Sequence, residues 1–319
     1  MVLREALAAL VIALPFAIGV TSVEPVETPL PEFRFTDPAI VESSGLAVVG
    51  GLVVTVNDSG DEARVFAVDP ATGDTVGVTR WGAEPTDIEA LAPGEAGTVW
   101  VGDIGDNTAG RETITVTRVP VGSGDRTVEA TAYELRYPGG ASDAEALLAH
   151  PETGRLYVVT KGVFGAVVHA APTELREDAV NLLRPVGRAM PIVTDGAFLP
   201  DGEHVVLRDY GRAVVYEFPS FEAVGEVALP AQQQGEGIAA AGDDRVLVSS
   251  EGQQAPVYDV ALPGRVEAEE PGATPSLGSR EGQELPQQPP GDRDPTRWLF
   301  GVGLAMVALL VLVRALRPR

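Results

Sequence analysis

The chain repeats itself five times between residues 33 and 263, and this repetition constrains its fold more than any other feature. Each repeat begins with a polar residue, usually acidic, followed by a small residue and an apolar run. The five starts are centred on Ser44, Glu89, Glu145, Asp195 and Glu236. Their spacings of 45, 56, 50 and 41 residues are typical of the blades of a β-propeller.

A second element follows each start at a constant place in the repeat. It is a β-prone run that ends in a polar residue and glycine, and its copies read VVTVNDSG, VWVGDIG, YVVTKG, VVLRDYG and VLVSSEG. A third β-prone run comes next, as in residues 63–68, 114–119 and 213–218. This order predicts a four-stranded antiparallel sheet for each repeat. Radial packing of neighbouring sheets would bury the faces that a single sheet exposes.

We therefore predict an all-β fold, a β-propeller of five four-stranded blades over residues 33–263. The fifth repeat has room for only three strands before residue 263, whereas Glu32–Ile40 is a spare β-prone segment at the start. We expect this segment to complete the fifth blade, because closing the ring removes exposed sheet edges. A six-bladed ring is the alternative, since the interval from Glu89 to Glu145 is long, although it holds a single copy of each element.

The segments outside the repeats predict targeting and anchoring. Residues 1–22 combine a basic residue, an apolar run and small residues, which is typical of a secretory signal peptide, with an uncleaved anchor as the alternative. Residues 264–296 are rich in Pro, Gly, Glu and Gln and predict an extended stalk. Residues 297–316 are largely apolar and predict a transmembrane helix, with residues 317–319 as a cytoplasmic tail.

The residues that flank the last apolar run predict its orientation. Trp298 suits the outer interface of a membrane, and Arg314, Arg317 and Arg319 suit the cytoplasmic side. We therefore expect a single-pass protein of the cell membrane that carries its propeller outside the cell and its C-terminus in the cytoplasm.

Composition excludes several classes of function. The chain has 46 acidic and 23 basic residues and a formal net charge of −23, so binding of nucleic acid is not expected and cations are the natural partners. It has no cysteine, which excludes disulfides, zinc–thiolate sites and thiol nucleophiles. The serine-hydrolase elbow, the P-loop and the dinucleotide-binding glycine motif are missing, and the three histidines lie at unrelated points of their repeats.

The two recurring polar elements converge in a propeller. The first strand of each blade lines the central channel, and the loops before it and after the second strand open at the same end. The predicted metal ligands on this rim are Asp87, Glu89, Asp103, Asp106, Asp143, Glu145 and Glu236. The other residues predicted to line the ligand rim are Asn57, Asp58, Asn107, Lys161, Arg208 and Asp209, with Asp195 and Glu251 beside them.

So many carboxylates near one axis repel one another unless they are protonated, hydrated or bridged by a hard cation. Calcium prefers several oxygen ligands in adaptable geometry, so calcium is the expected cofactor, shared by Glu89 and Glu145 with Asp103 and Asp106. Asp, Asn and Gly also serve tight turns through their own backbone, and this turn chemistry is the competing interpretation. No contiguous EF-hand loop is present, so a calcium site must be assembled from separate blades.

The motifs ESSGLAVV, DIEAL, DAEAL and VGDIGDN, taken with the repeated blades, resemble a family of secreted bacterial β-propellers with WD40-like, phytase-like and esterase-like members. The resemblance covers the repeats and not the stalk. It implies calcium held by the acidic residues of the channel mouth and used to bind phosphate. In this chain the basic residues for such a phosphate are Lys161, Arg111 and Arg208.

The sequence therefore predicts a monomeric, extracytoplasmic propeller that acts as a binding or interaction module at the cell envelope. Its partner would be a protein or an envelope ligand, and the membrane would be reached through the C-terminal helix. A calcium-dependent hydrolase of phytase-like or esterase-like type is the alternative. A structural spacer without any ligand is the third possibility.

Overall fold

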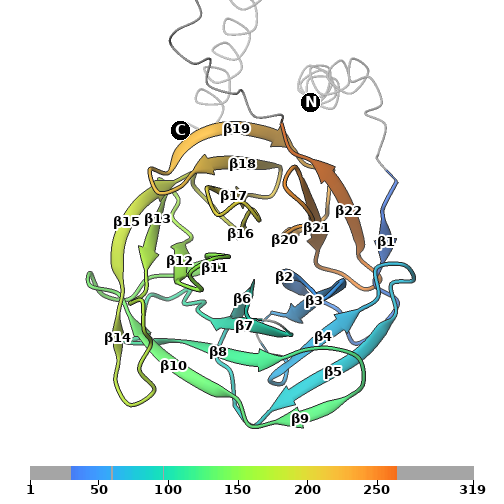
Figure 1. The fold of residues 1–319 in the computed structure, drawn as a ribbon, viewed down its shortest axis with the longest axis horizontal. Coiled ribbons are helices and arrows are strands. Elements are labelled where there is room, and N and C mark those ends of the chain that lie inside the picture. The colour runs from blue at the N-terminus through green and yellow to red at the C-terminus, as the bar shows by residue number, and fades with distance from the viewer. Residues whose placement is uncertain (1–29, 59, 96, 264–319) are drawn as a thin grey trace, which may run out of the picture. The chain divides into compact units, whose positions relative to one another are not determined.

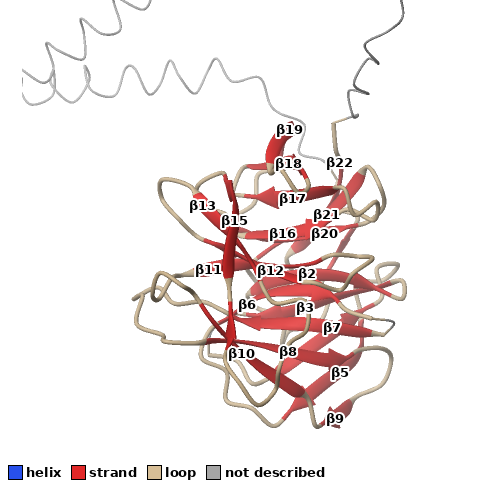
Figure 2. Cartoon of the chain, turned by 60° about the vertical axis from the view of Figure 1, so that its left-hand side comes forward, coloured by secondary structure: helices blue, strands red, loops and turns tan. Residues whose placement is uncertain are grey.

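The computed structural model describes residues 30–58, 60–95 and 97–263, and these residues form a five-bladed β-propeller (Figure 1). Their regular structure consists of strands (Figure 2), and none of them belongs to a helix that is long and apolar enough to cross a membrane. The predicted all-β fold and blade number are therefore confirmed. The predicted signal peptide, stalk, transmembrane helix and cytoplasmic tail lie outside the described residues.

Each blade is a four-stranded antiparallel core, numbered here in chain order. Blade 1 contains β2 (Ser43–Val49), β3 (Leu52–Asn57), β4 (Arg64–Val68) and β5 (Thr75–Trp81). Blade 2 contains β6 (Ile88–Pro93), β7 (Thr98–Asp103), β8 (Ile114–Pro120) and β10 (Thr131–Arg136). Blade 3 contains β11 (Ala144–Ala149), β12 (Leu156–Thr160), β13 (Ala166–Ala170) and β15 (Arg184–Ala189).

The last two blades follow the same order. Blade 4 contains β16 (Asp195–Phe198), β17 (His204–Arg208), β18 (Arg212–Glu217) and β19 (Glu222–Ala228). Blade 5 contains β20 (Gly235–Ala240), β21 (Arg245–Ser250), β22 (Pro256–Ala261) and β1 (Phe33–Arg34). Tight turns join the strands. Between β2 and β3 both Gly50 and Gly51 have positive φ, of 60° and 81°, which a two-residue hairpin turn of this kind requires.

The N-terminal segment closes the ring, as the sequence predicts. β1 pairs antiparallel with β22, so that Phe33 lies opposite Val257, although the strand itself covers only two residues of the expected segment. Phe35 and Ile40, which follow β1, are fully buried beside the first blade. Blade 5 is thus built from both ends of the propeller, and β1 covers part of the outer edge of β22.

The long interval between Glu89 and Glu145 holds a strap rather than a sixth blade. The strap, residues 121–130, leaves blade 2 and contains β9 (Arg126–Val128), which pairs parallel with β5 of blade 1. A shorter extension follows in blade 3, where β14 (Asn181–Leu182) pairs parallel with β10 of blade 2. Both additions extend the outer edge of a neighbouring blade and leave the number of blades at five.

The apolar core is divided into five clusters, each of which lies between two neighbouring blades. Leu46 and Phe66 of blade 1, for example, pack with Ala239 and Val257 of blade 5. Because every blade buries apolar side chains on both faces, a blade alone would expose much of its core to water. The ring is therefore the smallest stable unit, and it fixes the positions of the inner strands.

Candidate functional site

The inner strands β2, β6, β11, β16 and β20 surround the central channel (Figure 1). Strand pairing shows where the two recurring polar elements meet. Ile88 at the start of β6 lies opposite Asp103 at the end of β7, and Ala144 at the start of β11 lies opposite Thr160 at the end of β12. Both elements therefore open at one end of the channel, which we call the acidic mouth.

β-Bulges set the direction of the glutamates in the inner strands. The register of β6 shifts between Ile88 and Ala90, and that of β11 between Ala144 and Ala146, so Glu89 and Glu145 are the extra residues of their strands. A bulge re-aims one side chain without disturbing the apolar residues on either side of it. Glu89 and Glu145 keep only 5% and 4% of their surface exposed.

Blade 4 departs from this pattern. β16 pairs with β17 in continuous register, and Asp195 lies opposite Arg208. Asp195 is fully buried, and its Oδ2 accepts a hydrogen bond of 2.8 Å from the backbone N–H of Ile238 in blade 5. The repeat suggests that Asp195 is equivalent to Glu89, but without a bulge its carboxylate joins two blades instead of lining the rim.

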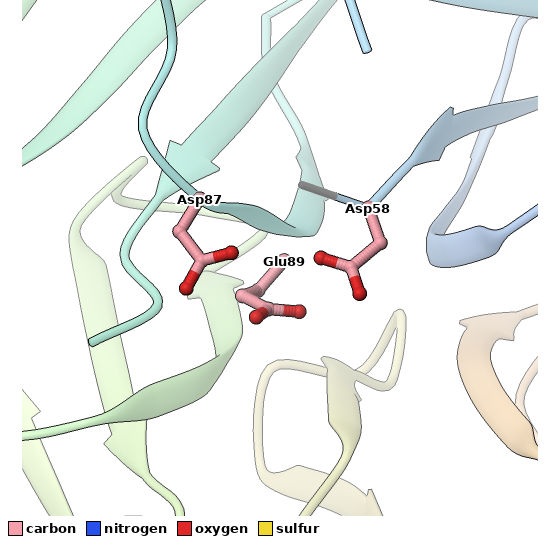
Figure 3. Close-up of side chains that lie close together, drawn as sticks. All are labelled: Asp58, Asp87 and Glu89. Carbon is pink, nitrogen blue, oxygen red and sulfur yellow. The ribbon is translucent and has the colours of Figure 1, made fainter. Parts of the chain in front are cut away.

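Three carboxylates from two blades converge at the acidic mouth. Asp58 follows β3, Asp87 precedes β6, and Glu89 belongs to β6 (Figure 3). One carboxylate oxygen from each residue lies within 4.8 Å of those of the other two. The structure thus joins two predicted metal ligands, Asp87 and Glu89, to Asp58, which was predicted for the ligand rim. We call these three residues the acidic trio.

Glu89 carries the strongest electrostatic perturbation of the trio. Burial raises its pKa to about 10, and the negative charges of Glu145, Asp58 and Asp87 add to this effect. Ser44 opposes it weakly, because its hydroxyl lies 3.2 Å from Glu89 Oε2. Burial also raises the pKa of Asp87. In the absence of a cation, Glu89 therefore holds a proton at neutral pH.

Gly105 makes room for two of these carboxylates. A β-carbon at this position would collide with the side chains of Asp87 and Glu89. The backbone N–H of Gly105 also donates a hydrogen bond of 3.1 Å to the carbonyl oxygen of Asp87. The loop after β7 therefore passes close to Asp87 and Glu89, and a side chain at position 105 would force their carboxylates to shift.

The acidic trio suits a hard cation. Its donors are all oxygens, and two oxygens on opposite sides of a calcium ion lie about 5 Å apart, which the spread of the trio allows. A divalent cation would replace the proton on Glu89 and compensate the neighbouring charges. The residues fit calcium by donor type, charge and spacing.

In the neighbouring blade 3, the equivalent carboxylate has a cation of its own. Lys161 Nζ lies 2.6 Å from Glu145 Oε1 and 5.7 Å from the centre of the Tyr210 ring. Burial raises the pKa of Glu145 to about 8, and Lys161 offsets part of the rise. Burial likewise raises the pKa of Glu236 to about 7, again against the charge of Lys161. This half of the mouth is partly neutralised from within.

Arg208 is fully buried and does not lie on an accessible rim, contrary to the sequence-based prediction. Its guanidinium donates to the carbonyl oxygens of Gly237 and Ser249 in blade 5, at 3.1 and 3.2 Å. Burial lowers its pKa to about 10, while Glu236 and Asp195 favour its charge. Arg208 thus ties blade 4 to blade 5, a role that the sequence alone did not indicate.

Asp103 and Asp106 mainly organise the loops of blade 2. Asp103 accepts hydrogen bonds from the backbone N–H groups of Thr86 and Asp87, at 3.0 and 2.9 Å, and pairs with Arg111 at 2.8 Å. Asp106 accepts the N–H of Arg111 at 2.8 Å and a second loop N–H. The contacts of Asp106 are the turn chemistry that was the competing interpretation of the acidic pattern, whereas those of Asp103 join the end of β7 to the loop before β6.

The remaining predicted residues are also placed by the structure. Asp143 accepts the backbone N–H of Asp106 through its side chain. Asn57 is buried and bonded to the backbone of the segment before β2, whereas Asn107 is exposed. Asp209 accepts two loop N–H groups and pairs with Arg212. None of these four side chains belongs to the group of convergent carboxylates found among the described residues.

The sequence analysis assigned no role at the mouth to Gly105, Ser44 or Tyr210. Gly105 follows the polar end of the second strand in VGDIGDN, and a glycine at this point was the available signal. Asp58 also lies at the polar end of its second strand, in VVTVNDSG, and this position could have indicated that it is a metal ligand rather than a general rim residue.

The fold and the mouth define a class of protein, the five-bladed β-propellers with an acidic channel entrance. No protein-family profile and no curated protein matches the sequence. Among solved structures, the PQQ-bound aldose sugar dehydrogenase of Streptomyces coelicolor is 12% identical with a TM-score of 0.43, and the match covers 74% of this chain and 98% of that one.

Two further structures show a comparable degree of similarity. A gluconolactonase from Xanthomonas campestris is 13% identical, with a TM-score of 0.41 and coverage of 73% of this chain and 89% of that chain. A luciferin-regenerating enzyme is 12% identical, with a TM-score of 0.42 and coverage of 70% and 79%. These similarities concern the fold alone. Membership of the secreted propeller family that the motifs resemble stays a prediction.

Proposed function

We propose that this protein is a calcium-dependent binding module whose ion is held at the acidic mouth by Asp58, Asp87 and Glu89. The observation that carries the proposal is the convergence of three carboxylates from separate segments around a glutamate that is buried. Burying a carboxylate beside two others is costly, and a bound cation offsets that cost. A side chain at Gly105 would collide with Asp87 and Glu89, and this close packing supports the proposal that the carboxylates form a binding site.

Calcium is the ion that the donors favour. Magnesium requires near-ideal octahedral geometry and loses its water reluctantly, whereas the trio comes from a loop, a turn and a bulged strand of two blades. Zinc, copper, iron and nickel prefer imidazole or thiolate ligands, and the trio offers carboxylates only. Calcium accepts such an irregular set and completes its shell with water.

The ligand follows from the positions that the trio leaves open. Three carboxylates that each give one oxygen fill at most half of the six to eight positions around calcium, so oxygen atoms of a ligand can take the others. Lys161, whose side chain is 23% exposed, adds a positive charge at the mouth from the neighbouring blade 3. The proposed ligand is an oxygen-rich group of a partner protein or an envelope polymer.

The proposed location outside the cell agrees with the affinity expected of the proposed calcium site. We propose that the propeller works outside the cell and is anchored in the membrane through residues 297–316. Calcium sites of extracellular modules have dissociation constants of about 10⁻⁴ to 10⁻³ M, and a site with three carboxylates and several waters belongs in that class. The stalk, residues 264–296, would hold the mouth away from the membrane.

The proposal is tested by titrating the full-length chain with calcium after treatment with a chelator. The melting temperature should rise with free calcium, because the ion binds the folded state only. Glu89→Gln combined with Asp58→Asn should abolish the rise, while Glu222→Gln, an exposed substitution in blade 4, should keep it. Identical melting with calcium and with chelator would overturn the calcium site.

A calcium-dependent hydrolase is the second candidate. The observation in its favour is the partly exposed ammonium of Lys161 facing the mouth that also holds the trio, since a cation and a lysine together suit an anionic ester. Among the described residues, however, no serine or threonine hydroxyl is hydrogen-bonded to a histidine. Calcium-dependent release of nitrophenol from p-nitrophenyl phosphate, lost in Glu89→Gln, would favour the hydrolase over the binding module.

A further inference from the structure

The strap, residues 121–130, spans the outer edges of blades 1 and 2 and is fixed at several points. Gly124 donates its backbone N–H to the carbonyl oxygen of Val76 at 2.8 Å, and the side chain of Asp125 accepts the N–H of Val78 at 3.0 Å. A β-carbon at Gly77 would collide with the backbone of Gly122. The strap therefore sits tightly on blade 1 and then returns to blade 2 as β10.

A cavity of about 520 Å³ lies beside this crossing. Its apolar lining includes Trp81 at the end of β5, Ile88 at the start of β6 and Val128 of the strap. The volume falls in the range of pockets that bind small molecules. The cavity is separate from the acidic trio, none of whose members lines it.

The polar lining of the cavity is one-sided in charge. Its polar and acidic residues include Thr117, Glu84 and Glu129, and none of its lining residues is a lysine, arginine or histidine. Neither glutamate forms an ion pair with any part of the chain that the structure describes. Asp103 also lines the cavity, but Arg111 and two backbone N–H groups already compensate its carboxylate.

We infer that this cavity binds a small organic amine. The apolar walls suit an aromatic or branched aliphatic body, and an indole such as that of Trp81 also attracts cations over its face. The two uncompensated carboxylates attract an ammonium group, and the same charges repel an anion. A neutral molecule of the same shape would gain the apolar contacts alone.

The experiment compares three probes that share one ring. Tryptamine, tryptophol and indole-3-acetate are titrated into the full-length chain by calorimetry, with a chelator present so that the result does not depend on the calcium site. Tryptamine should bind about tenfold more tightly than tryptophol, which is what two partly exposed ion pairs can supply. Indole-3-acetate should bind more weakly than either.

Variants locate the binding. Glu84→Gln combined with Glu129→Gln should reduce the affinity for tryptamine to that for tryptophol and leave the melting temperature unchanged, since both side chains are exposed. Ala130→Leu, which narrows the cavity, should weaken the binding of both tryptamine and tryptophol, and Glu222→Gln should change neither affinity. Equal affinity for the three probes, no binding of tryptamine, or no effect of the double glutamine variant would overturn the inference.

Discussion

The two halves of the acidic mouth use the same backbone position in opposite ways. In blade 2 the bulge residue Glu89 faces Asp58 and Asp87, and no cation of the described chain pairs with it. In blade 3 the bulge residue Glu145 is paired with Lys161 at 2.6 Å. Burial is nearly equal in the two cases, at 5% and 4% exposed surface. The two glutamates differ in the charged side chains that surround them.

This comparison shows how a repeated fold acquires one site. Blades 2, 3 and 5 repeat the same bulge in their inner strands, and each of these bulges carries a glutamate. A carboxylate that meets an internal cation is compensated by the protein itself. One that meets other carboxylates needs a proton or a metal ion. The predictions below test whether the two halves differ in this way.

The largest effect is expected on the compensated side of the ring. Arg208→Met removes the cation that bridges blades 4 and 5 and leaves Asp195 and Glu236 buried without it. The free energy of unfolding, measured with a chemical denaturant, should fall by about 3–5 kcal/mol. Arg212→Met, at a partly exposed ion pair with Asp209, should cost about 1 kcal/mol or less. Equal losses of unfolding free energy in the two variants would contradict the expected difference between the buried Arg208 and the partly exposed Arg212.

The next effect concerns the uncompensated side. Gly105→Ala places a methyl group where the carboxylates of Asp87 and Glu89 lie, so the trio must open. Calcium affinity measured by calorimetry should weaken about 100-fold, or about 2.7 kcal/mol. Gly139→Ala, where a β-carbon would meet open space, is the matched control and should keep the affinity. Unchanged binding in Gly105→Ala would separate the calcium site from the trio.

Calcium affinity should also depend on pH. Because burial and its acidic neighbours raise the pKa of Glu89 to about 10, calcium must displace a proton from it at neutral pH. The affinity should therefore rise with pH between about 6 and 9, by at most tenfold or about 1.4 kcal/mol per unit. Calorimetry in two buffers of different ionisation enthalpy measures the released proton, and Glu89→Gln should abolish this dependence.

Stability without calcium should show the opposite trend, which gives an independent check. A raised pKa means that the folded state keeps the proton of Glu89 up to a higher pH than the unfolded chain does. The contribution of this group is complete below pH 4.5 and is lost as pH rises toward about 10, by at most about 1.4 kcal/mol per unit. Denaturant titrations at several pH values should show a smaller fall in Glu89→Gln. A slope that the substitution leaves unaltered would contradict this assignment.

The smallest effect is expected from the internal cation. Lys161→Gln removes the positive charge beside Glu145 and should make the mouth more attractive to calcium. The affinity should increase about threefold, in line with the modest energy of a partly exposed charge. Arg188→Gln, an exposed substitution on β15, should have no effect. Weaker calcium binding in Lys161→Gln would mean that the two halves work together rather than in contrast.

Much of the architecture could be predicted from the sequence because it depends on local patterns. The β-prone runs that end in a polar residue and glycine became the second strands, from β3 (Leu52–Asn57) to β21 (Arg245–Ser250). The spare segment Glu32–Ile40 supplied the closing strand β1. Strand propensity, turn residues and the period of the repeat are properties of neighbouring residues, so they can be read in one dimension.

The site could be predicted only in part. The sequence indicated that Asp87 and Glu89 lie at the mouth, because both belong to the recurring start of a blade. It could not tell that Asp58 completes their group, that Lys161 pairs with Glu145, or that Arg208 is fully buried. These contacts join different blades or depend on a bulge, and a one-residue change of register moves a side chain to the other face of its strand.

The sequence by itself thus determined the repeated blade, the order of its strands and the accumulation of acidic residues at one end of the channel, and the structure settled the number of blades at five. Only the tertiary structure decided which of those residues meet and which are compensated. The physical reason is that the energy of a buried charge depends on the groups around it in space. In a ring, those groups come from neighbouring blades, tens of residues away along the chain.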